Sequence, residues 1–108
     1  MSIYNKLIRD RIVEILENEE LNYNVRILEE DEYLTEIKKK LHEEVKEFEQ
    51  TTNQTDALEE LSDILELIHA ALAVHKKSFE ELEEVRMKKQ NERGGFEKRL
   101  FLIDVEDR

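Results

Sequence analysis

Residues 43–63, with the sequence EEVKEFEQTTNQTDALEELSD, decide how we expect this chain to fold. A polar link at residues 51–55 separates two segments whose apolar side chains recur at helical spacing, and so short a link favours an antiparallel helix pair. Four acidic residues of this stretch fall into two pairs with matched spacing: Glu44 with Glu47, and Glu60 with Asp63. Because residues three or four apart share a face of a helix, each pair projects together. The helix pair therefore predicts that four carboxylates converge.

Carboxylates gathered at one point repel each other strongly unless a cation sits among them. The chain has 28 acidic residues, so some acidic pairs on solvated helix faces are expected by chance. These two pairs differ from chance pairs because they border apolar stripes and because the short link lets them face each other. Carboxylate oxygens are the ligands that Mg²⁺ and Mn²⁺ prefer. The pattern predicts a divalent-metal site that acts on a phosphate substrate.

The rest of the chain extends this helix pair into an all-α protein. We expect helices over residues 5–20, 32–51 and 56–75, with Asp31 as the N-cap of the second. The third has the widest apolar face and is predicted to be the most buried. A capping box at Ser78 begins a fourth helix, and Gly94 ends it. Partial alternation allows a short two-stranded β element from residues 24–28 and 100–104.

Composition limits the fold and the partners. The chain has 108 residues, no Cys or Pro, and 42% charged residues, which favours one helical domain over residues 1–108. Its net charge of −11 argues against nonspecific binding to nucleic acid or to an anionic membrane. It lacks both a run of about 20 apolar residues and an apolar signal core. We therefore expect a cytoplasmic protein.

Basic residues near the two ends of the chain have two interpretations. Lys6 and Arg9 lie near the start of the first predicted helix, which is the unfavourable end for cations. They either pair with the acidic surface or lie near a substrate phosphate. Lys89 and Arg93 crowd the last turns of the fourth helix, where the helix dipole favours cations in any case.

The pattern E-E-x-x-E followed by E-x-x-D on two helices resembles the MazG-like all-α nucleoside triphosphate pyrophosphohydrolases. That superfamily includes the phosphoribosyl-ATP pyrophosphohydrolases and the dimeric dUTPases. The opening YNKLIRDRI at residues 4–12 and the ending KKQNERGGF at residues 88–96 are similar to a short, single-domain branch. The resemblance covers nearly the whole chain and implies an antiparallel four-helix bundle. It also implies Mg²⁺-dependent cleavage between the α- and β-phosphates, giving a nucleoside monophosphate and pyrophosphate, with Mn²⁺ as the alternative metal.

The resemblance also assigns roles to residues. It implies that the metal ligands are Glu44, Glu47, Glu60 and Asp63. Glu43 fits a supporting role, and either Glu43 or Glu47 is a candidate to accept the proton of the attacking water. The residues similar to the family's phosphate contacts are Lys89, Asn91 and Arg93, with Lys40, Lys6 and Arg9 as further candidates. A homodimer or homotetramer is implied as well.

Three classes of function compete, and the last of them is a purely structural helical oligomer. The first is an enzyme that removes noncanonical or surplus nucleoside triphosphates from the nucleotide pool. The second is a non-catalytic helical module that binds nucleotide or a protein partner. The intact acidic quartet argues against the second, because a protein that only binds phosphates has little use for four carboxylates.

Overall fold

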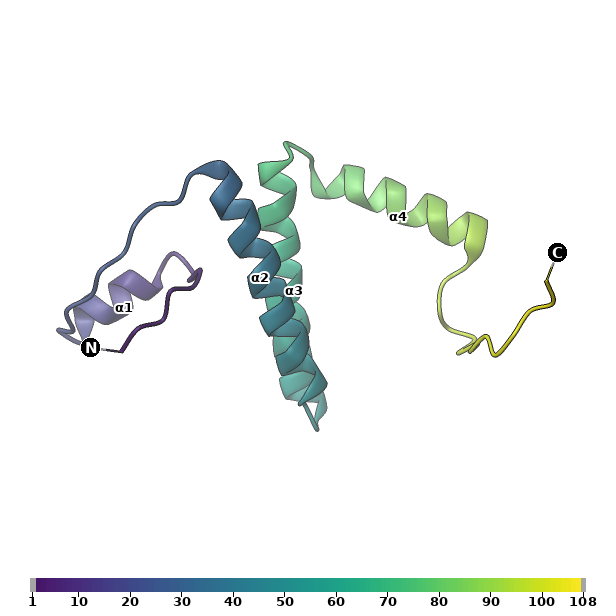
Figure 1. Ribbon diagram of the computed structural model, residues 1–108, viewed down its shortest axis with the longest axis horizontal. Helices are drawn as coiled ribbons and strands as arrows, with labels where there is room; N and C mark the ends of the chain where they lie inside the picture. Colours follow the sequence, from purple (N-terminus) through teal and green to yellow (C-terminus); the bar gives the residue numbers. More distant parts are fainter. Residues whose placement is uncertain (1, 108) are drawn as a thin grey trace. The chain divides into compact units, whose positions relative to one another are not determined.

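The computed structural model describes residues 2–107, and the regular structure within them is helical (Figure 1). The four helices are α1 (Ile12–Asn18), α2 (Glu30–Glu49), α3 (Gln54–Val74) and α4 (Phe79–Arg93). The chain divides into two compact units, residues 1–76 and residues 77–108, and each is described here by itself. The prediction of an all-α protein is confirmed for the described part of the chain.

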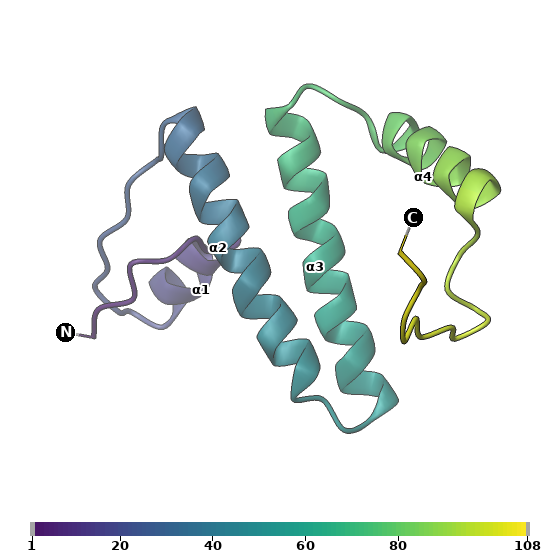
Figure 2. The same cartoon turned by 45° about the vertical axis from the view of Figure 1, so that its right-hand side comes forward.

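Helices α2 and α3 pack side by side and run in opposite directions, as both views show (Figures 1 and 2). A short polar link joins them, and Asn53 ends it by capping α3: its side chain accepts a 2.8 Å hydrogen bond from the Asp56 backbone N–H. The cap satisfies one of the four backbone donors that the start of a helix leaves unpaired. Ile37 on α2 is fully buried. This pair forms the framework for the acidic side chains.

The expectation that the third helix is the most buried is wrong for the described residues. No residue of α3 is buried, and Leu58 is 70% exposed. Leu61 and Leu65, which share a face with Leu58, are also exposed. The helix has an apolar face about half its circumference wide, and α2 covers only part of it.

The first helix is shorter than predicted. It begins at Ile12, not at residue 5, and its N-cap Arg11 makes no capping hydrogen bond through its side chain. Asn5 adopts a left-handed φ of 45°, which is incompatible with a continuous helix through this residue. The cations of residues 6–11 would lie at the unfavourable end of a longer helix. The segment is instead non-helical, and its side chains reach α2 and α3.

The caps of the later helices are partly as predicted. Ser78 caps α4 by accepting a hydrogen bond from the Glu81 N–H, and Gly94 ends it with a φ of 83°. The prediction of Asp31 as an N-cap is wrong, because α2 begins earlier and its N-cap is Glu29. Asp31 lies in the first turn, where its carboxylate suits the helix dipole.

The predicted two-stranded element is absent from the described residues. Residues 24–28 and 100–104 have no regular secondary structure, and they belong to different units. Two isolated strands are marginal in water, and the alternation of apolar side chains in both segments is incomplete. Ile27, Phe101 and Ile103 are almost fully exposed. Among the described residues, no helix is long and apolar enough to cross a membrane.

Candidate metal centre

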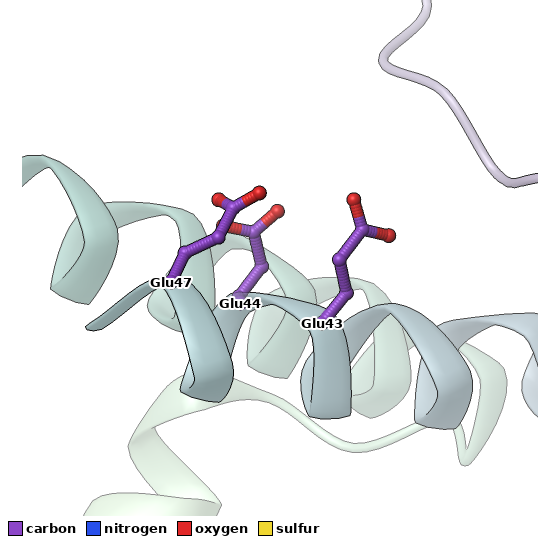
Figure 3. Close-up of side chains that lie close together, drawn as sticks. All are labelled: Glu43, Glu44 and Glu47. Carbon is purple, nitrogen blue, oxygen red and sulfur yellow. The ribbon is translucent and has the colours of Figure 1, made fainter. Parts of the chain in front are cut away.

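Five acidic side chains come together on one side of the α2–α3 pair. Helix α2 contributes Glu43, Glu44 and Glu47, whose carboxylates extend to the same side of the helix (Figure 3). Helix α3 contributes Glu60 and Asp63. Each of two groups offers oxygens within 4.8 Å of one another: Glu43, Glu44 and Glu47, and Glu44, Glu60 and Asp63. The predicted convergence of the two acidic pairs is therefore present, and Glu44 belongs to both groups.

Glu44 is the central residue of this cluster. It is only 5% exposed and is the one buried charged or polar residue of the described chain. Its Oε2 atom is buried without a hydrogen-bond partner, and so is Oε2 of Glu60. A buried carboxylate oxygen without a partner is unfavourable unless a proton or a cation satisfies it. The two atoms therefore mark a place where the fold lacks a positive charge.

The pKa values of Glu44 and Glu60 reflect this shortage of positive charge. Burial, together with side-chain contacts to Glu60 and Glu47, raises the pKa of Glu44 to about 7. The contact with Glu44 lowers the pKa of Glu60, but burial and the charge of Glu47 outweigh it, so that the pKa of Glu60 is raised. Close carboxylates titrate as a coupled set, because each ionisation opposes the next.

Lys40 is an internal counterion of the cluster. Its Nζ atom lies 3.6 Å from Glu43 and 3.7 Å from Glu44, and its side chain is largely buried. Lys40 and the two glutamates are three and four residues apart on α2, so the ion pairs follow directly from helical spacing. The distances allow electrostatic attraction but exceed those of hydrogen bonds.

Two further cations reach the cluster from the segment that precedes α1. The Nζ atom of Lys6 lies 3.7 Å from Glu43. Arg9 donates a 2.6 Å hydrogen bond from Nη2 to Oδ1 of Asp63. In this structure Lys6 and Arg9 pair with acidic side chains, which is the first of the two interpretations given above.

The donor set fits a divalent cation of the Mg²⁺ or Mn²⁺ type. All candidate ligand atoms are carboxylate oxygens, which such hard cations prefer, and two of them lack any other partner. Glu47 is exposed and leaves one side of the cluster open to solvent. Next to it lies an open depression of about 260 Å³, lined by residues that include Glu47, Gln50 and Glu60. That volume is below the roughly 300–1,000 Å³ of typical small-molecule sites.

The candidate phosphate-binding residues lie in both units. Lys6, Arg9 and Lys40 contact the acidic cluster in the first unit. Lys89, Asn91 and Arg93 are exposed side chains of α4 in the second unit. Their role toward phosphate stays a prediction.

Sequence reasoning did not identify Asp63 as the partner of Arg9, 54 positions away. The signal that was available is the placement of cations at the unfavourable end of a predicted helix.

Comparisons with protein-family models, with curated proteins and with solved structures found no match for this chain.

Proposed function

We propose that this protein is a divalent-cation-dependent nucleoside triphosphate pyrophosphohydrolase of the MazG-like type. The substrate would be cleaved between its α- and β-phosphates to give a nucleoside monophosphate and pyrophosphate. The observation that carries the proposal is the carboxylate cluster of α2 and α3, in which buried oxygens of Glu44 and Glu60 lack a partner. The MazG-like arrangement of the four helices belongs to the same proposal.

In this proposal, Glu44, Glu47, Glu60 and Asp63 hold Mg²⁺ or Mn²⁺. The metal supplies charge neutralisation at the phosphate oxygens and favours ionisation of water. Glu44 is the most buried of these four residues. Glu47 is exposed and faces the side from which a substrate can approach. A carboxylate that is buried and short of positive charge has more to gain from a cation than one in water.

The chain's own residues account for the proton transfer. Glu43 is a half-buried member of the cluster, and its carboxylate lies 3.7 Å from Lys6 and 3.6 Å from Lys40. It is positioned to accept a proton from water, with Glu47 as the alternative base. The water oxygen forms a bond to phosphorus, the P–O bond of the α–β linkage breaks, and pyrophosphate leaves with the electron pair. No Ser, Cys or His nucleophile is required.

The direct test is release of pyrophosphate from a panel of nucleoside and deoxynucleoside triphosphates with Mg²⁺. We expect turnover with at least one substrate, and loss of turnover when the metal is chelated. Glu47→Ala and Asp63→Ala should each lower the rate by on the order of a hundredfold or more. Glu49→Gln on the exposed side of α2 is the matched control and should keep full activity. Folded protein that turns over no nucleotide contradicts the proposal.

We also propose that the protein works as a homodimer or homotetramer. Leu58, Leu61 and Leu65 form an exposed apolar row on α3, and contiguous apolar surface of this kind marks interaction sites. The depression beside the acidic cluster is open and smaller than typical small-molecule sites, so surface from a second subunit would help to enclose a nucleotide. Light scattering after size exclusion should give a multiple of the 13.0 kDa chain mass. A purely monomeric species that is fully active would refute this point.

The exposed row on α3 is also the observation that favours the second candidate function, a protein-interaction module without catalysis. That reading predicts association through α3 with no Mg²⁺-stimulated turnover. Leu61→Glu separates the two functions: loss of assembly together with loss of activity supports the enzyme. Loss of assembly in a protein that never turns over nucleotide supports the module.

A further inference from the structure

The non-helical segment before α1 carries two cations into the acidic cluster. Arg9 is hydrogen-bonded to Asp63 at 2.6 Å, and Lys6 lies 3.7 Å from Glu43. Asp63 is a member of one candidate ligand group and Glu43 of the other. Each group of carboxylates is thus paired with one cation from the same short segment.

These contacts are of a kind that is readily exchanged. The side chains of Arg9 and Asp63 are 57% and 37% exposed, and those of Lys6 and Glu43 are similar. Ion pairs between exposed side chains contribute little net stability, because water solvates the separated charges well. Lys40 differs, since it is largely buried and belongs to α2 itself.

We propose that Lys6 and Arg9 are exchangeable counterions that occupy the carboxylate cluster until a divalent cation enters. They then transfer to the phosphate groups of the substrate. This inference rests on the proposed metal centre and adds an order of events to it. Arg9 occupies Oδ1 of Asp63, so a metal bound to that carboxylate would lie close to the guanidinium, and like-charge repulsion would weaken both contacts.

The charges of the cluster favour such an exchange. Five carboxylates face three cations, Lys6, Arg9 and Lys40, so two negative charges remain when every carboxylate is ionised. A divalent cation carries the same charge as Lys6 and Arg9 together, so it can replace both without changing the net charge of the cluster. A bound triphosphate then becomes the strongest available partner of Lys6 and Arg9. Arginine is well suited to this transfer because its planar guanidinium binds carboxylate and phosphate with the same fork of donors.

The test compares Arg9→Ala with Arg11→Ala, a matched control two residues away. Arg11 pairs with Glu14 on α1 and does not contact the cluster. Calorimetric titration with Mn²⁺ alone should show binding about two- to fivefold tighter in Arg9→Ala than in the wild type, because the metal no longer displaces a counterion. Arg11→Ala should bind Mn²⁺ like the wild type.

A second titration measures pyrophosphate binding in saturating Mg²⁺. Here we expect Arg9→Ala to bind more weakly than the wild type, whereas it should bind Mn²⁺ more tightly. Arg9→Ala loses a charge-assisted hydrogen bond to phosphate and should bind pyrophosphate on the order of tenfold more weakly. Tighter metal binding combined with weaker phosphate binding is not expected of a residue that merely supports the fold. Circular dichroism establishes that both variants keep the helical content of the wild type.

The outcomes separate the two proposals. Wild-type protein that binds no Mn²⁺ would overturn the metal centre, and the exchange with it. Wild-type protein that binds Mn²⁺, with equal or weaker binding in Arg9→Ala, would overturn the exchange and leave the metal centre standing. Unchanged pyrophosphate binding in Arg9→Ala would overturn the transfer to phosphate.

Discussion

Replacing Glu44 by glutamine should stabilise the metal-free protein at pH 8 and should weaken metal binding at the proposed centre. Burial and the neighbouring carboxylates raise the pKa of Glu44 from 4.5 to about 7. In the unfolded chain the group returns to its ordinary value. The folded state therefore binds the proton more tightly, and the free energy of unfolding falls as the pH rises from about 4.5 to 7.

The size of the effect follows from the pKa difference. One pKa unit corresponds to about 1.4 kcal/mol, so ionising Glu44 removes up to about 3 kcal/mol of stability from the metal-free protein above pH 7. Glutamine keeps the volume of the side chain and carries no charge. Its amide also offers a donor to the unpartnered Oε2 of Glu60. We expect the advantage of Glu44→Gln to be greatest near pH 8 and small below pH 4.5.

The assay is urea unfolding at pH 5 and pH 8, with a chelator and again with excess Mg²⁺. A cation that binds only the folded state stabilises it, by about 2.7 kcal/mol at a hundred times its dissociation constant. The wild type should gain from Mg²⁺ at pH 8, whereas Glu44→Gln should gain little. Wild-type and variant unfolding energies that run parallel from pH 5 to pH 8 would refute the assignment of the pKa to Glu44.

Three smaller predictions concern the framework of the site. Ile37→Ala should lower the free energy of unfolding by about 2–5 kcal/mol, because Ile37 is the fully buried apolar side chain of the described residues. A loss below about 1 kcal/mol in urea unfolding would show that Ile37 is not part of a packed core. Asn53→Ala should cost about 1 kcal/mol through loss of the α3 cap, while Thr52→Ala, outside the cap, should be close to neutral. Ser78→Ala should reduce the helical signal of α4 on mild heating, and an unchanged circular dichroism curve would contradict its capping role.

Local chemistry explains why much of the fold was predictable. The caps at Asn53 and Ser78 and the stop at Gly94 are short-range signals, and α2, α3 and α4 lie within about two residues of their expected bounds. The first helix was not predictable in this way. Residues 5–11 have helical spacing of apolar side chains, but they are non-helical, and Lys6 and Arg9 make their contacts with residues more than 35 positions away.

The site, like the fold, could be predicted from the sequence only in part. Helical spacing placed Glu44 beside Glu47 and Glu60 beside Asp63, and the short link brought the two pairs together. Spacing alone did not show that Glu44 would be nearly inaccessible, because burial depends on how closely α2 and α3 approach each other. The strand prediction was wrong for a related reason: a strand needs a partner, and alternation in a single segment says nothing about whether one is present.

The acidic cluster offers a reason for the position of two cations, Lys6 and Arg9, in the segment before α1. A cluster of this kind disfavours folding of the metal-free protein, since its carboxylates repel one another and two of their oxygens are buried without partners. Cations fixed on α2 or α3 would offset that repulsion, but they would also compete permanently with a metal. Lys6 and Arg9 come from a non-helical segment and are exposed, so they offset the repulsion, and in the proposed exchange they leave when a divalent cation binds. In the proposed exchange, the largely buried Lys40 supplies the positive charge that stays, and Lys6 and Arg9 supply the positive charge that is exchanged.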